Sequence, residues 1–185
     1  MTDLDIGMNT RLCEPFQWDD TRAYDRGKVM TYKTLEEGKE FGRYLDVDGD
    51  GIAYRTYPGT HPTKGGYFPR GTTKDRFARY SETGPDYVDN VQRLLKKFET
   101  AKTLVPKPLL YPAAKPARFG AIFYGSTSPA MQEALDVLAQ RGIHVNALRV
   151  RGFPFQEEIN DFVASHPWVF VVEQNRDAQL KTMLV

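Results

Sequence analysis

The sequence has one cysteine, no surplus of either charge and no long apolar run. The lone Cys13 excludes an intramolecular disulfide and a Cys-ligated iron–sulfur cluster within the chain. A net charge of +1 gives no electrostatic case for binding nucleic acid or a membrane surface. No apolar stretch approaches the roughly 18–20 residues of a membrane span, and the N-terminus lacks the features of a secretory signal. We therefore expect a cytoplasmic protein that binds neither nucleic acid nor membrane.

Residues 1–82 lack a sustained hydrophobic period. They are rich in Gly, Pro, Tyr, Thr and Asp, and their only helical hint is the stretch 34–45, which Gly38 weakens. Such a long irregular stretch argues against a free-standing compact domain. We expect this segment to pack against something else. We also expect Cys13 to be a buried structural residue, as lone cysteines usually are.

A regular helix is expected after this irregular stretch. Residues 85–105 carry an apolar stripe at helical spacing, formed by Val88, Val91, Leu94, Leu95, Phe98 and Ala101. Four prolines within 106–116 cannot continue that helix. The pattern therefore predicts a loop-rich segment over 1–105 that ends in one amphipathic helix, followed by an extended Pro-rich linker over 106–117.

Beyond the linker, short apolar runs alternate with helical patterns. Strands are expected over 119–125, 143–150 and 168–174, and helices over 126–142, 155–166 and 176–185. Strands separated by helices favour right-handed crossovers and a parallel sheet. The fold class is thus α/β, with a small parallel βαβαβ sheet unit over 118–185. Because three strands make a small sheet and the last helix has no cap, we expect this unit to be truncated.

The stretch LDVDGDGI (45–52) resembles the start of two known sites. A calcium loop of the EF-hand type needs a carboxylate at its twelfth position, which here is Tyr57. The Gly-Asp-Gly of thiamine enzymes needs a following Asn to complete a magnesium shell, and the first one is Asn90, inside the predicted helix. An Asp/Gly-rich turn is favoured. A calcium loop stays open as the rival.

Two glycine-containing stretches could hold an anion. The run GTHPTKGGYFPRGTTKD (59–75) gathers cationic side chains among glycines, which suits a carboxylate or phosphate, although a solvated loop explains it as well. YGSTSPAMQ (124–132) leads from a strand into a helix, whose first amides could bind an anion. Its Ser and Thr residues are equally ordinary helix caps.

A set of polar residues follows the second and third strands, at the edge where open α/β sheets bind ligands. We favour a subunit interface there, with solvated charge as the alternative. The set is Arg149, Arg151, Glu173, Asn175 and Arg176. No nucleophile–base pattern and no metal-ligand spacing of the three histidines is present, so no residue is assigned as catalytic or as a metal ligand.

Several segments resemble the alpha subunit of 2-oxoacid:ferredoxin oxidoreductases, with the 2-oxoglutarate type closest. They are TDLDIGMN, YDRGKV, LLKKFETAK, VFVVEQNRDAQL and the long run over 41–68, FGRYLDVDGDGIAYRTYPGTHPTKGGYF. The resemblance covers essentially the whole chain. It implies oxidative decarboxylation of a 2-oxoacid with thiamine diphosphate, coenzyme A and ferredoxin, or the reverse reaction.

The resemblance also implies an assembly. Residues 1–105 would be the tail of the pyrimidine-side thiamine domain, and 118–185 a transketolase C-terminal-like domain. Thiamine diphosphate with magnesium, and the iron–sulfur cluster, would lie mainly on a beta subunit, with a second alpha subunit and ferredoxin as further partners. The chain would then be one part of the subunit, inactive in isolation.

Four residues are carried over by the resemblance as substrate- or cofactor-proximal: His61, Lys64, Arg70 and Gly71. Relatives typically show a Gly-His-Asp/Asn-Glu run where this chain has residues 73–76, Thr-Lys-Asp-Arg, and their earlier substrate loops are missing here. Pyruvate or a branched-chain 2-oxoacid therefore stays open as the substrate. The rival from another class is a non-catalytic flavodoxin-like interaction module with a calcium loop.

Overall fold

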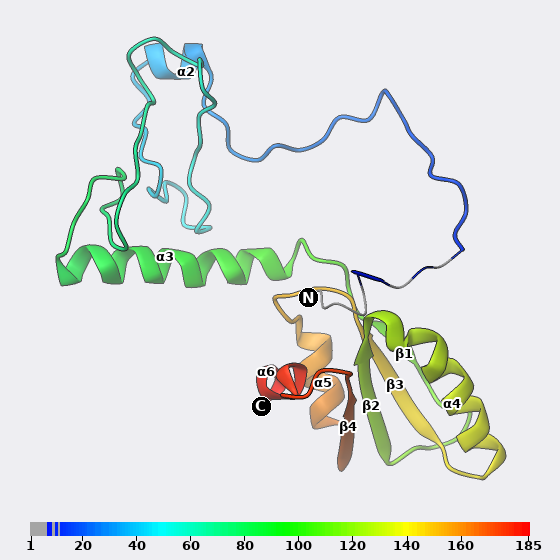
Figure 1. Cartoon of the computed structure of the whole chain (residues 1–185). Helices are drawn as coiled ribbons and strands as arrows, with labels where there is room; N and C mark the ends of the chain where they lie inside the picture. Colours follow the sequence, from blue (N-terminus) through cyan, green and yellow to red (C-terminus); the bar gives the residue numbers. More distant parts are fainter. Residues whose placement is uncertain (1–6, 9, 11) are drawn as a thin grey trace. The chain divides into compact units, whose positions relative to one another are not determined.

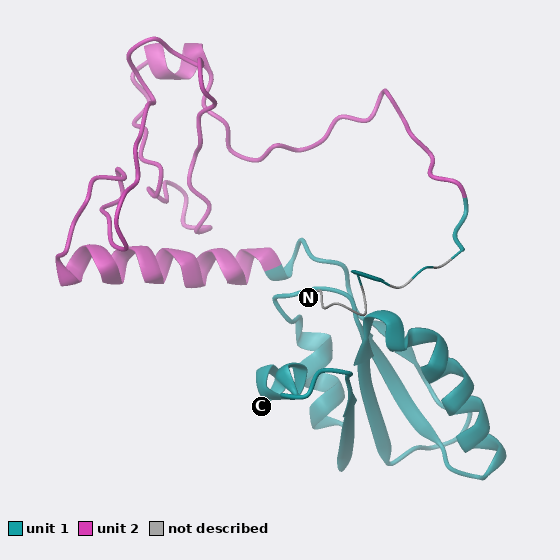
Figure 2. Ribbon diagram, viewed as in Figure 1, with its two compact units in different colours: residues 1–14, 102–185 teal, residues 15–101 magenta. Residues whose placement is uncertain are grey.

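The computed structural model describes residues 7, 8, 10 and 12–185. The chain divides into two compact units, one of residues 1–14 with 102–185 and the other of residues 15–101 (Figure 2). We call the first the sheet unit and the second the loop unit. No helix among the described residues is both long enough and apolar enough to span a membrane.

The loop unit contains little regular structure besides two helices. The helix expected over 34–45 is a single short one, α2 (Tyr32–Glu36), which begins at a Thr31 capping box. It ends early because Gly38 has a φ of +80°, a conformation outside the helical region. Two isolated bridges, Val29 with Arg55 and Lys74 with Tyr80, hold the remaining loops.

The second helix is α3 (Gly84–Lys102), at the position that the apolar stripe predicts. None of its residues is buried, and Val88, Leu94 and Leu95 are each more than two-fifths exposed. An amphipathic helix normally buries its apolar stripe. Much of the apolar stripe is therefore exposed in the part of the chain that the structure describes, and packing against another domain stays a prediction. Cys13 is exposed, contrary to the expected burial.

The sheet unit is built on a four-stranded mixed sheet in the order β1-β3-β2-β4. The central β2 (Phe119–Tyr124) pairs in parallel with β3 (Val145–Val150) and with β4 (Trp168–Val172). The predicted α/β class and the three parallel strands are confirmed. The prediction was one strand short, because β1 (Leu109–Tyr111), within the expected linker, pairs antiparallel with β3. Prolines on both sides keep β1 short, and its edge position tolerates them.

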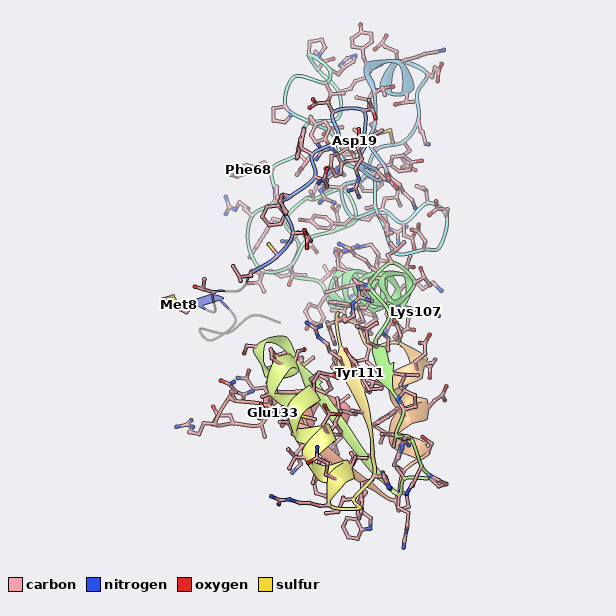
Figure 3. The ribbon with its side chains drawn as sticks, turned by 90° about the vertical axis from the view of Figure 1, so that its right-hand side faces the viewer. Met8, Asp19, Phe68, Lys107, Tyr111 and Glu133 are labelled. Carbon is pink, nitrogen blue, oxygen red and sulfur yellow. The ribbon has the colours of Figure 1, made fainter. Side chains whose placement is uncertain are left out.

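Helices cover both faces of this sheet (Figure 1). Helix α4 (Ser128–Gln140) packs on one face around Phe123, and the ring of Tyr111, labelled in Figure 3, lies 5.9 Å from the Phe123 ring. Helices α5 (Glu157–Ala164) and α6 (Gln179–Leu184) pack on the other face around Ile122 and Leu148. The first crossover leads from β2 to β3, and the second leads from β3 past β2 to β4, so the strand order reverses between β2 and β4.

Candidate functional site

His61 lies at the centre of a hydrogen-bond network in the loop unit. Its side chain is only 4% exposed. Its Nδ1 accepts hydrogen bonds from the amides of Thr63 and Lys64, at 3.1 and 2.9 Å. The ring proton therefore belongs on Nε2, which lies 2.8 Å from Glu36 Oε1. The ring of Tyr32 stacks on the imidazole with centroids 4.8 Å apart. His61 thus fixes the glycine-rich loop to α2.

Lys64 shares the same carboxylate. Its Nζ donates to Glu36 Oε1 at 2.7 Å and to the Leu35 carbonyl at 3.3 Å. The Lys64 hydrogen bond, followed by that of His61, holds the pKa of Glu36 below its ordinary value. Glu36 therefore stays ionised and accepts hydrogen bonds from both side chains. Sequence reasoning missed it, because the partners lie 25 and 28 positions away and nothing in its local sequence marks it.

A cavity of about 320 Å³ opens beside this network. Its walls are the turn 56–59, His61 and the glycine-rich stretch 64–67. Backbone amides of a glycine-rich wall can approach an anion closely. Because Lys64 already has a carboxylate partner, the cavity's own charge is largely balanced.

Arg70 lines a second cavity of about 480 Å³ that shares the wall 65–67 with the first. Its guanidinium lies 5.6 Å from the centroid of the Tyr80 ring. Among the described residues it forms no ion pair with a carboxylate. Phe68, which also lines this cavity, is 80% exposed and projects from the loop (Figure 3). Arg70 therefore has charge left for a ligand.

Gly71 supports the second cavity by its lack of a side chain. It has a φ of +74°, and a Cβ there would lie 2.6 Å from the Tyr80 ring. The structure thus places His61 and Lys64 on one side of the wall 65–67, and Arg70 with Gly71 toward Tyr80 on the other. A hydrogen bond to Glu82 raises the pKa of Tyr80, which keeps this phenol protonated.

The carboxylates of the Asp-rich loop form ion pairs with Lys28, a residue of the same chain. Lys28 Nζ lies 2.5 Å from Asp48 and 2.7 Å from Asp50, while Asp46 accepts from the amides of Gly49 and Gly51. Burial acts to lower the pKa of Lys28, but the bonds to the two carboxylates outweigh it and raise that pKa. This arrangement agrees with the favoured turn.

The same loop is held on α3. The Gly51 carbonyl accepts from Arg93 at 2.9 Å, and the Asp50 carbonyl accepts from Thr100. Gly51 lies against the α3 backbone, where even a methyl group would not fit. The Asp50 carboxylate is engaged by Lys28 and by the Ile52 amide. This Gly-Asp-Gly therefore does not fit magnesium and a diphosphate group.

The five polar residues expected at the sheet edge do not form one cluster. Glu173 accepts hydrogen bonds from the amides of Leu180 and Lys181, and Asn175 accepts one from Gln179. These two side chains start α6 and are structural. Arg176 pairs with the adjacent Asp177, and its side chain is 91% exposed. Arg149 and Arg151 lie apart from them and line a cavity at the ends of β2 and β3.

No protein-family model and no curated protein matches the sequence. One similar solved structure is a 2-oxoglutarate:ferredoxin oxidoreductase from Magnetococcus marinus with 2-oxoglutarate, coenzyme A and succinyl-CoA bound. The TM-score is 0.67 at 20% sequence identity, with 80% of this chain and 26% of that chain covered. This similarity establishes the fold. The chain spans about a quarter of the length of that structure's chain.

Proposed function

We propose that the chain is part of the alpha subunit of a 2-oxoacid:ferredoxin oxidoreductase. The enzyme would decarboxylate 2-oxoglutarate oxidatively to its acyl-CoA, with ferredoxin accepting the electrons, or run in reverse. The observation that carries the proposal is the fold shared with the 2-oxoglutarate enzyme over 80% of this chain. The sequence resemblance over 41–68 is independent of that fold and leads to the same enzyme.

In this proposal the chain acts within an assembly and is inactive alone. Thiamine diphosphate with magnesium, and the iron–sulfur cluster, belong mainly to the beta subunit, since the Gly-Asp-Gly of this chain does not fit the diphosphate. A second alpha subunit, ferredoxin and coenzyme A complete the cytoplasmic complex. The exposed apolar stripe of α3 and the exposed segment around Arg176 are the proposed contact surfaces. Glu173 and Asn175 shape that segment by holding α6.

Within the complex the cavities beside His61, Lys64 and Gly71 form one wall of the active site, and Arg70 supplies its free positive charge. Replacing Arg70 by methionine should raise KM for the 2-oxoacid about tenfold, because a charge-assisted contact is worth roughly 1.5 kcal/mol. Steady-state kinetics of the assembled enzyme measure this. Arg22→Met is the matched control, since Arg22 also lies over a tyrosine ring in the loop unit. An equal change in both variants would contradict the assignment.

The proposed function is tested on the native complex. An antibody to this chain should precipitate an activity from the source extract that reduces viologen in a coenzyme A-dependent reaction with 2-oxoglutarate. Activity with pyruvate or a branched-chain 2-oxoacid instead would keep the enzyme class and change the substrate. No activity, with intact partner subunits in the precipitate, would reject the oxidoreductase and leave a fold reused for another purpose.

A further inference from the structure

A cavity of about 320 Å³ lies at the carboxyl edge of the sheet unit. Tyr124 and Val150 are the last paired residues of the parallel strands β2 and β3. The cavity is lined by the segments that follow, 124–125 and 149–152, together with Pro106. Open α/β sheets bind ligands outside the carboxyl ends of their strands. The place and the size are those of a small-molecule site.

Two guanidinium groups line this cavity without a carboxylate. Neither Arg149 nor Arg151 forms an ion pair among the described residues, and no acidic residue is part of the lining. The Nε of Arg149 is buried and has no hydrogen-bond partner. Buried cationic groups are normally paired, because the loss of hydration is otherwise uncompensated. Arg149 Nε is therefore a donor without an acceptor, and an anionic ligand in the cavity would supply one.

The start of α4 adds to the same preference. Gly125, with a φ of +61°, turns the chain from β2 into a short 3-10 turn, η1 (Gly125–Thr127), and then into the helix. The Ser and Thr residues were expected to cap this helix, but neither the turn nor α4 receives a side-chain cap. Ser128, 9% exposed, has a buried hydroxyl without a partner. The dipole of α4 favours negative charge near its N-terminus, and Gly125 is the residue of this turn that lines the cavity.

We propose that this cavity binds the phosphate group of a small phosphorylated molecule. Arg149 and Arg151 contact the phosphate oxygens, since a planar guanidinium matches a phosphate with two parallel hydrogen bonds. Two cations supply more positive charge than one carboxylate balances, which favours a dianion. The site is separate from the cavities of the loop unit and does not depend on the oxidoreductase reaction.

The test uses the full chain and inorganic phosphate as the probe. Calorimetric titration should give a dissociation constant near about 1 mM, weakened at least tenfold by Arg149→Gln and by Arg151→Gln. Binding should weaken further as salt rises. Arg141→Gln is the control, because Arg141 is an exposed arginine at the end of α4, far along the helix from the cavity. Melting temperatures of all variants show whether each one is folded.

Three outcomes would overturn the proposal. One is a wild-type chain that gives no heat with phosphate. Another is equal weakening by Arg141→Gln, which would mean non-specific attraction to surface charge. The third is phosphate binding by the wild type that neither Arg149→Gln nor Arg151→Gln weakens, which would place the phosphate elsewhere on the chain. Because the titration needs no turnover, its failure is distinguishable from failure of the proposed enzyme activity.

Discussion

Replacing Gly51 by alanine should destabilise the loop unit by about 3 kcal/mol. Gly51 has a φ of +77°, which costs a residue with a Cβ about 1–2 kcal/mol. The new Cβ would also lie 2.3 Å from the Lys97 amide nitrogen and 2.7 Å from the Arg93 carbonyl oxygen. These are backbone atoms of α3, and they cannot move aside without breaking the helix. The Asp-rich loop would have to leave α3.

Gly49→Ala is the matched control, two positions away in the same loop. Gly49 has nearly the same conformation, with a φ of +79°, but a Cβ added there would have no atom within 4 Å. The Gly49→Ala substitution should lower the free energy of unfolding only by the cost of the left-handed conformation, about 1 kcal/mol. Urea unfolding followed by circular dichroism, with hydrogen exchange of the α3 amides, measures the difference. Equal losses in the two variants would mean that the contact of the loop with α3 does not contribute to stability.

The parts of the fold that repeat over a short range could be predicted from the sequence. The strands at 119–124 and 168–172 are almost wholly apolar, and the strand at 145–150 is apolar apart from Asn146 and Arg149, which is typical of a parallel sheet. Helix α3 follows from its 3.6-residue period alone. β1 could not be predicted in this way. Three residues between prolines carry no period, and only the free edge of β3 makes them a strand.

The candidate site depends on contacts between distant positions, which sequence patterns do not encode. His61 and Lys64 stood out because cationic residues among glycines are unusual, but their common partner Glu36 lies in another element. The same holds for Lys28, which reaches the aspartates from about 20 positions away. Local spacing suggested a metal loop there, and a long-range ion pair accounts for the same carboxylates.

Replacing Lys28 by alanine should destabilise the loop unit by about 2 kcal/mol and make its stability depend on calcium. Asp46, Asp48 and Asp50 have carboxylate oxygens within 4.8 Å of one another, and the Lys28 ammonium lies on two of them. Without this cation the carboxylates repel each other, although their partial exposure limits the loss. Millimolar calcium should restore the stability of the variant, since a cluster of carboxylate oxygens is the ligand set that calcium prefers. The wild-type chain should not respond.

Lys33→Ala is the control for this experiment. Lys33 is an exposed lysine that pairs only with Glu37, at 3.7 Å, so its loss should have little effect and no calcium dependence.

The dependence of stability on acid is a second test of the ion pair. Burial acts to raise the pKa of Asp50, but the hydrogen bonds from Lys28 and the Ile52 amide outweigh it and lower that pKa. The ion pair therefore stabilises the wild type above the ordinary aspartate pKa, and its contribution is lost as the pH falls through the lowered value. The Lys28→Ala chain should lack much of that acid-dependent loss. If calcium instead stabilised the wild type as strongly as the variant, calcium would be able to displace the Lys28 ammonium from the carboxylates. That result would favour the rival hypothesis of a calcium-dependent interaction module.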